Sequence, residues 1–261
     1  METRPVAWWL KVTMVFVGFW LVVPVLIVIP LSFAKQPSFV FPPKELGFNN
    51  YVKFFTDSSW VVSLSVSVRL ALIVAVISTV LGVLASFGLT RGKYRGKSAM
   101  QAILLLPIVT PGIVVAIAVY AFFIKLQMVG SWPAFILAHT LIAMPFVIVT
   151  VSSALATFDR RLERAAASLG ANSLKTMLRV TIPVIMPGIL SGAVFAFVTS
   201  FDEVVIALFI QSPTLHTLPT KMWQSITSEI DPTIAAASTL LIVVTTVLIL
   251  IPQLVRRSSN D

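Results

Sequence analysis

Six long apolar runs constrain the fold more than any other feature of the sequence. Each is about as long as the roughly 20 residues that a helix needs, at 1.5 Å per residue, to cross the hydrocarbon core of a bilayer. Of the 261 residues, 57% are hydrophobic and only 11% are charged, against about 25% charged in soluble domains. The sequence therefore predicts an all-α polytopic membrane protein with six transmembrane helices. The runs cover approximately residues 10–33, 62–89, 100–124, 134–156, 182–210 and 233–254.

The lysines and arginines between these runs predict the orientation of the helices. Thirteen lie on the side that carries both termini and five on the other side. Cytoplasmic loops are enriched in Lys and Arg, so both termini are predicted to be cytoplasmic. The thirteen are Arg4, Lys11, Arg91, Lys93, Arg95, Lys97, Arg160, Arg161, Arg164, Lys175, Arg179, Arg256 and Arg257. The five are Lys35, Lys44, Lys53, Lys125 and Lys221.

The sequence offers little for covalent chemistry or for a metal. Cysteine is absent, and the two histidines, His139 and His216, have no paired acids at ligand spacing, so no metal site is expected. The segment RGKYRGKS at 91–98 ends like a nucleotide-binding P-loop, but Arg91 stands where that motif needs glycine. The net charge of +9 arises from short basic clusters between apolar runs. We therefore expect membrane lipid around the chain and no nucleic acid.

The segment between the fourth and fifth runs predicts a helical hairpin. Asp159 can cap a short helix that ends at Gly170, and Asn172 or Ser173 begins a second one. Pro183 and Pro187 are expected to bend the chain into the fifth run. The apolar face suits either packing against neighbouring membrane helices or docking of a partner. That face consists of Leu162, Ala165, Ala166 and Leu169 in the first helix and Leu174, Met177, Leu178 and Thr181 in the second.

This hairpin resembles a motif of a known family. The stretch LERAAASLGANSLKTMLRVTIPVIMPGIL at 162–190 resembles the EAA loop of ABC importer permeases, in which Glu-Ala-Ala and three further residues precede glycine. Aligning that glycine with Gly170 puts the Glu of the motif at Arg164, so the acidic position departs from the pattern, and Glu163 stands one residue earlier. Neither charge has an evident partner within the hairpin. In the family this loop forms the coupling helix that fits a groove on the cytoplasmic ATPase. The resemblance implies a cytoplasmic coupling loop over 157–181, with Glu163, Arg164, Ala165, Ala166, Gly170 and Ala171 as ATPase-coupling residues.

The resemblance extends over nearly the whole chain and implies a type I ABC importer. LLPIVTPGIVVAIA in the third run and SFDEVVIALFI in the fifth resemble the spermidine and putrescine permease branch. Residues 1–261 would then form a single permease domain in the bacterial inner membrane. A homologous second permease would complete the pathway, two cytoplasmic ATPases would drive it, and a periplasmic binding protein would deliver the solute. ATP would be bound and hydrolysed by the ATPase subunits, so the chain itself is expected to need no cofactor and to be no enzyme.

The resemblance implies a small organic cation or amine as the substrate, with a polyamine as the expected one. Importers of 4-aminobutyrate, opines or phosphonates are the alternatives within the family. An ion-coupled secondary transporter and an intramembrane enzyme are the other classes that the residues leave open. Transport that depends on an ATPase partner distinguishes the importer from both.

Three charges inside the apolar runs mark candidate residues of the substrate path: Arg69, Asp202 and Glu203. A charge at the bilayer centre costs about 2.5 to 3.5 kcal/mol, so it usually faces a partner or a watery cavity. One interpretation is an ion pair between Arg69 and one of the acids. The other is that at least one carboxylate faces the path and helps to pass a cationic amine. Adjacent helical positions point about 100° apart, so one acid can face the path while the other packs.

Overall fold

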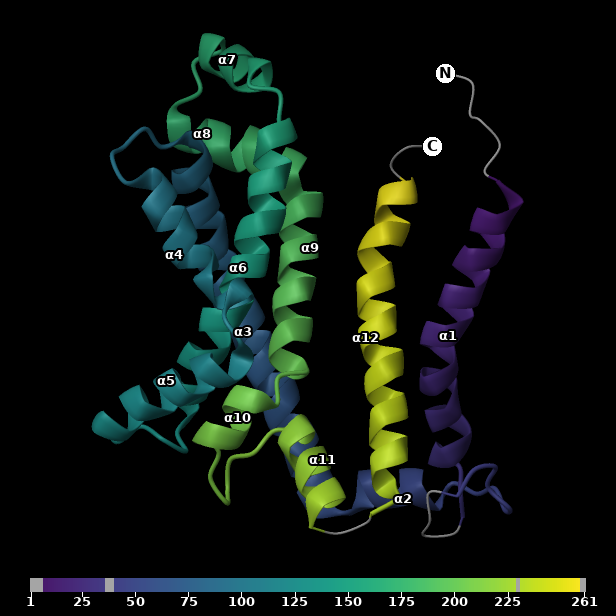
Figure 1. Ribbon diagram of the computed structural model, residues 1–261. Coiled ribbons are helices and arrows are strands. Elements are labelled where there is room, and N and C mark those ends of the chain that lie inside the picture. The colour runs from purple at the N-terminus through teal and green to yellow at the C-terminus, as the bar shows by residue number, and fades with distance from the viewer. Residues whose placement is uncertain (1–6, 36–39, 229–230, 259–261) are drawn as a thin grey trace. The chain divides into compact units, whose positions relative to one another are not determined.

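The computed structural model describes residues 7–35, 40–228 and 231–258, and most of these residues are helical. The described ranges contain no β-strand. Their β-type pairing consists of two isolated bridges, Ala34 with Leu46 and Ser212 with Leu215. The prediction of an all-α fold is confirmed. The helices are shown in chain order from purple to yellow in Figure 1.

Four helices of the described residues are long and apolar enough to cross a membrane. They are α1 (Trp8–Ser32), α3 (Ser58–Arg91), α6 (Trp132–Thr157) and the continuous helix Ser173–Phe201. The last comprises α8 (Ser173–Thr176), the π-helix η1 (Met177–Thr181) and α9 (Ile182–Phe201). The chain is thus a multi-pass membrane protein, whereas the number of six spans stays a prediction.

The third and sixth apolar runs are not among these four helices. The third run divides into α4 (Lys97–Val109) and α5 (Gly112–Lys125), which are bent by 106° relative to each other. The two helices add a fifth span only if the bent pair crosses the membrane as a single span. Thr110, with ψ of 133°, leaves the helical conformation because the ring of the following Pro111 disfavours it. The sixth run forms α12 (Thr233–Ser258), of which Thr233–Leu248 is the apolar stretch that the structure describes without a gap.

The chain forms two compact units, of which the first comprises Met1–Val61 and Met222–Val244. Asn50 in α2 (Asn49–Thr56) donates hydrogen bonds to the backbone oxygens of Ser32 and Ala34, which fixes α2 against the end of α1. Lys53 Nζ lies 2.9 Å from Asp231 Oδ2 and so joins α2 to the residues that precede α12. Phe54 and Trp60, both almost fully buried, pack with ring centroids 5.8 Å apart.

The second unit comprises Val62–Lys221 and Thr245–Asp261 and is built around α6. Helices α6 and α9 pack side by side, and α10 (Val205–Ile210) packs on α5 (Figure 1). α7 (Arg161–Ser168) lies at one end of α6 and α9, and α10 lies at the opposite end (Figure 1). α11 (Leu218–Thr227) follows α10 and runs from this unit into the first.

Small residues bring α3 and α9 close to α6. A Cβ on Gly192 would lie 2.6 Å from Thr150 Oγ1 and 3.1 Å from Val147 Cα, so α9 approaches the backbone of α6 where it has no side chain. A Cβ on Gly82 of α3 would lie 2.6 Å from Cγ1 of the same α6 residue, Val147. Membrane helices have little hydrophobic drive to associate and depend on such close packing. These contacts hold together the three helices that connect the two ends of the second unit.

Candidate functional site

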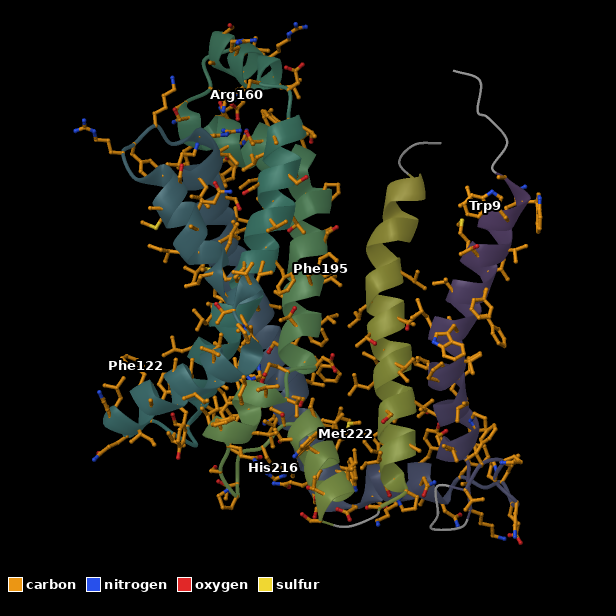
Figure 2. The ribbon with its side chains drawn as sticks, viewed as in Figure 1. Trp9, Phe122, Arg160, Phe195, His216 and Met222 are labelled. Carbon is orange, nitrogen blue, oxygen red and sulfur yellow. The ribbon has the colours of Figure 1, made fainter. Side chains whose placement is uncertain are left out.

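The 157–181 hairpin lies at one end of the second unit, where Arg160 is labelled in Figure 2. Asp159 Oδ1 accepts a hydrogen bond from the Arg161 amide at 2.8 Å, and Asn172 Oδ1 accepts one from the Lys175 amide at 2.8 Å. The Asp159 carboxylate and the Asn172 amide therefore each cap the helix that the sequence predicts to begin there. Pro183 and Pro187 lie within one continuous helix, Ser173–Phe201, whose π-turn η1 precedes them and in which the Ile182 amide donates to the Met177 oxygen.

Gly170 ends α7 in a Schellman motif. Its φ is +81°, its amide donates to the Ala167 oxygen at 2.9 Å, and the Ala171 amide donates to the Ala166 oxygen at 3.0 Å. A residue with a Cβ is strained at this φ, so glycine suits the turn that reverses the chain between α7 and α8.

Most of the apolar face of the hairpin is open. No residue of α7 is buried, and Leu169 at its end is 90% exposed. Leu162, Leu174 and Leu178 are also exposed. Ala165 and Ala166 lie among them with small side chains that leave the α7 backbone accessible. Met177 is half-buried and Thr181 is buried, so the end of this face packs into the unit, whereas its exposed leucines are available to a partner.

Glu163 differs from the other residues of the hairpin because it points into the unit. Its Oε1 lies 2.7 Å from Arg91 Nη2 at the end of α3 and accepts a hydrogen bond from Thr181 Oγ1 at 2.5 Å. The expectation that the hairpin offers Glu163 no evident partner is wrong, because Thr181 at the end of the hairpin donates to it, and Arg91 contacts it from outside the hairpin. Arg164, the next residue, is exposed. Neither Arg91 nor Thr181 was identified as a partner from the sequence, in which Arg91 lies 72 positions before Glu163.

The acidic pair lies at the opposite end of the unit, where the chain breaks between α9 and α10. Glu203 stands just before Val204, the N-cap residue of α10, and its side chain caps the first turn: its Oε1 accepts from the Ile206 amide at 2.7 Å and its Oε2 from the Ala207 amide at 2.9 Å. Its side chain is only 10% exposed. Asp202, at the end of α9, is exposed. The structure thus separates the two acids, with Glu203 packed and Asp202 open.

A buried histidine of α6 is hydrogen-bonded to the end of α9 and lies beside Glu203. His139 is fully buried, its Nδ1 lies 3.0 Å from Ser200 Oγ in the last turn of α9, and its Nε2 lies 3.9 Å from Glu203 Oε2. Sequence reasoning considered His139 only as a metal ligand. Its place within an apolar run was the signal for a role inside the membrane, because buried polar groups there need partners.

Arg69 forms no ion pair with Asp202 or Glu203, and all three residues lie in the described part of the chain. Its side chain is exposed. The interpretation of a structural ion pair is therefore wrong, because the break after α9 directs Glu203 to α10 and leaves Asp202 at the surface. Across residues 7–35, 40–228 and 231–258, no three His, Cys, Asp or Glu side chains gather as a metal site requires.

Comparisons with known proteins agree on one family. The model of a family described as the binding-protein-dependent transport system inner membrane component matches residues 78–260. The spermidine/putrescine transport system permease protein PotC of Haemophilus influenzae is 29% identical over 242 residues, which cover 92% of this chain and 93% of that protein. The putrescine transport system permease protein PotI of Escherichia coli K12 is 33% identical over 196 residues, covering 72% and 70%.

Solved structures show the same fold. A chain from the crystal structure of a bacterial ABC transporter involved in the import of the acidic polysaccharide alginate matches with a TM-score of 0.73. The match covers 97% of this chain and 96% of that one at 17% sequence identity. At this identity the likeness concerns the fold and carries no information on the solute.

Proposed function

Because the chain belongs to the family of inner membrane components of binding-protein-dependent transport systems, we propose that it is the permease subunit of an ATP-driven importer of polyamines. The observation that carries this proposal is the similarity to a spermidine/putrescine permease along nearly the whole chain. The chain forms half of a translocation pathway, and a homologous second permease forms the other half. A periplasmic binding protein delivers the polyamine to the pair.

The energy for transport comes from two ATPase subunits, one of which docks on the 157–181 hairpin from the cytoplasm. The exposed apolar face of α7 supports this assignment, because an open face of small and apolar residues suits close contact with another protein. Arg164, Ala165, Ala166, Gly170 and Ala171 lie on or beside this surface. ATP is bound by the ATPase subunits, and the permease itself uses no cofactor and catalyses no reaction. Both termini face the cytoplasm, as the distribution of Lys and Arg predicts.

Asp202 is the residue of the acidic pair that we assign to the polyamine path. It is exposed at the end of α9, whereas both carboxylate oxygens of Glu203 are engaged by the amides of α10. A carboxylate that keeps its acceptor sites free can attract an ammonium group of a passing polyamine. Glu203 and His139 hold the chain break that presents Asp202.

Reconstitution tests the assignment directly. The chain, its second permease and the ATPase are placed in proteoliposomes, and uptake of labelled putrescine and spermidine is measured with the binding protein and ATP. We expect uptake that requires all components, with 4-aminobutyrate, opines and phosphonates failing to compete. Uptake by the chain alone, driven by a proton or sodium gradient, would contradict the importer assignment. Competition by one of the other solutes would contradict the polyamine assignment alone.

A further inference from the structure

Three helical elements meet at a single carboxylate oxygen beneath the hairpin. Glu163 belongs to α7, Arg91 is the last residue of α3, and Thr181 is the last residue of η1, which continues directly into α9. Arg91 Nη2 and Thr181 Oγ1 both contact Oε1 of Glu163. Contacts between charged partners at 2.7 Å are among the stronger hydrogen bonds in proteins. The carboxylate therefore ties α7 to two helices of the membrane unit at once.

The surroundings of this contact hold it in one geometry. The Arg91 guanidinium lies 4.8 Å from the ring centroid of Phe87 and 5.8 Å from that of Phe158, so two aromatic rings flank it. The side chains of Arg91 and Glu163 are 27% and 21% exposed, and Thr181 is fully buried. An arginine packed between rings and partly shielded from water keeps its orientation better than a solvated surface pair.

The rest of α7 has no comparable attachment. None of its eight residues is buried. The π-turn of η1 lies directly between α8 and α9, and such turns are frequent at functional sites in helices. A displacement of α7 can therefore reach α3 and α9 through Glu163, in addition to the covalent path through Gly170 and α8.

From this geometry we infer that Glu163 is a positioning residue that transmits movement of the hairpin to α3 and α9 through Arg91 and Thr181. It does not contact the ATPase itself. The inference rests on the proposed function, in which an ATPase subunit docks on α7. When the ATPases close, the Arg91–Glu163–Thr181 contact makes α7, α3 and α9 move together, so that hydrolysis is linked to opening of the path.

The test measures the number of ATP molecules hydrolysed per polyamine transported in the reconstituted complex. Glu163→Ala removes the contact, and Lys93→Ala removes an exposed charge two residues after Arg91, outside the hairpin, as the matched control. We expect Glu163→Ala to retain the ATPase on co-purification but to raise the ATP-to-substrate ratio about fivefold or more, the lower end of typical coupling between sites. Lys93→Ala is expected to leave the ratio unchanged. Glu163→Gln, which keeps an acceptor oxygen but loses the charge, should give an intermediate ratio.

Two further variants make the result decisive. Thr181→Val removes only the hydroxyl donor and should raise the ratio even if Glu163→Ala fails to assemble. Arg91→Glu combined with Glu163→Arg restores an ion pair and should lower the ratio relative to Arg91→Glu alone. An unchanged ratio in assembled Glu163→Ala or Thr181→Val complexes overturns the inference, as does a loss of uptake that only parallels a loss of assembly. Failure of the unaltered chain to retain an ATPase would overturn the proposed function as well. This outcome is distinguishable from failure of the inference alone, in which the unaltered complex assembles and transports.

Discussion

The separation of Asp202 from Glu203 leads to opposite expectations for two conservative substitutions. Asp202→Asn removes a charge from an exposed carboxylate that makes no capping contact. Glu203→Gln replaces one carboxylate oxygen by an amide NH2 group. Because the two oxygens of Glu203 accept from the Ile206 and Ala207 amides, that NH2 group necessarily faces a backbone donor. Asp202→Asn should therefore act on transport and Glu203→Gln on stability.

The size of the stability change follows from the contacts that are lost. A hydrogen bond to a charged acceptor contributes about 1.5–3 kcal/mol, and loss of a helix N-terminal cap costs about 0.5–2 kcal/mol. Glu203 is 10% exposed, so water replaces its carboxylate poorly. We expect Glu203→Gln to destabilise the protein by about 1.5–3 kcal/mol, which corresponds to a fall of roughly 3–12 °C in the midpoint of thermal unfolding for a chain of this size.

Thermal unfolding of the detergent-solubilised protein and polyamine uptake by the reconstituted complex check these expectations together. Asp202→Asn is expected to unfold at the temperature of the unaltered protein and to lose uptake. Glu203→Gln is expected to unfold earlier and to lose uptake only in proportion to the protein that remains assembled. The reasoning is refuted if Glu203→Gln keeps its unfolding midpoint but abolishes uptake, because Glu203 would then act on the solute. Normal uptake by Asp202→Asn would refute the assignment of Asp202 to the polyamine path.

Four other predictions concern separate parts of the chain. Gly170→Val puts a β-branched residue at a φ of +81°, which costs about 1–2 kcal/mol. Co-purification of the ATPase should therefore fall, and full retention of the ATPase would contradict the requirement for a fixed turn at Gly170. Gly192→Val forces a Cβ to within 2.6 Å of Thr150 Oγ1 and should lower stability by about 1–3 kcal/mol, whereas Gly88→Val, with open space around its Cβ, serves as the control. Burial raises the pKa of Asp231, but hydrogen bonds from Lys53 and Thr233 outweigh burial and hold the pKa below the usual 3.8. This carboxylate therefore stabilises the fold fully above pH 3.8 and less as the pH falls through the lowered pKa. Asp231→Asn should flatten the pH dependence of thermal unfolding in that range, and an unchanged pH dependence would contradict the contact with Lys53. A cysteine introduced at Arg95 should be labelled from the cytoplasm and one at Lys44 from the periplasm, and the reverse pattern would invert the orientation.

Local features of the hairpin were predictable because they depend on residues only a few positions apart. The caps at Asp159 and Asn172 bond to amides two and three residues later. Gly170 ends α7 through bonds to carbonyls within five residues. Likewise, apolar runs of sufficient length predict membrane helices whatever their neighbours are, because the bilayer sets the length. The fold class and the place of the hairpin therefore follow from the sequence.

The bend between α4 and α5 was predictable only in part, because the sequence marks its position and the tertiary structure sets its angle. Pro111 signals a break, but the 106° angle reflects the packing of α5 against α10, which belongs to a distant part of the chain. The same holds for Pro183 and Pro187, where the chain stays helical because the π-turn of η1 and the packing of α9 on α6 accommodate the missing amides. Proline restricts its own residue and the one before it, and leaves the direction of the chain to its surroundings.

The roles of the charged residues were decided by the tertiary structure alone. Whether a carboxylate is a cap, an ion-pair partner or an open site depends on which donors reach it, and these donors come from other helices or from the far side of a chain break. Glu163 meets Arg91 only because α3 ends beside α7, and Glu203 leaves Asp202 exposed only because α10 starts a new helix. A hydrophobic pattern specifies which segments enter the membrane, but the packing of small residues between α3, α6 and α9 specifies which side chains meet.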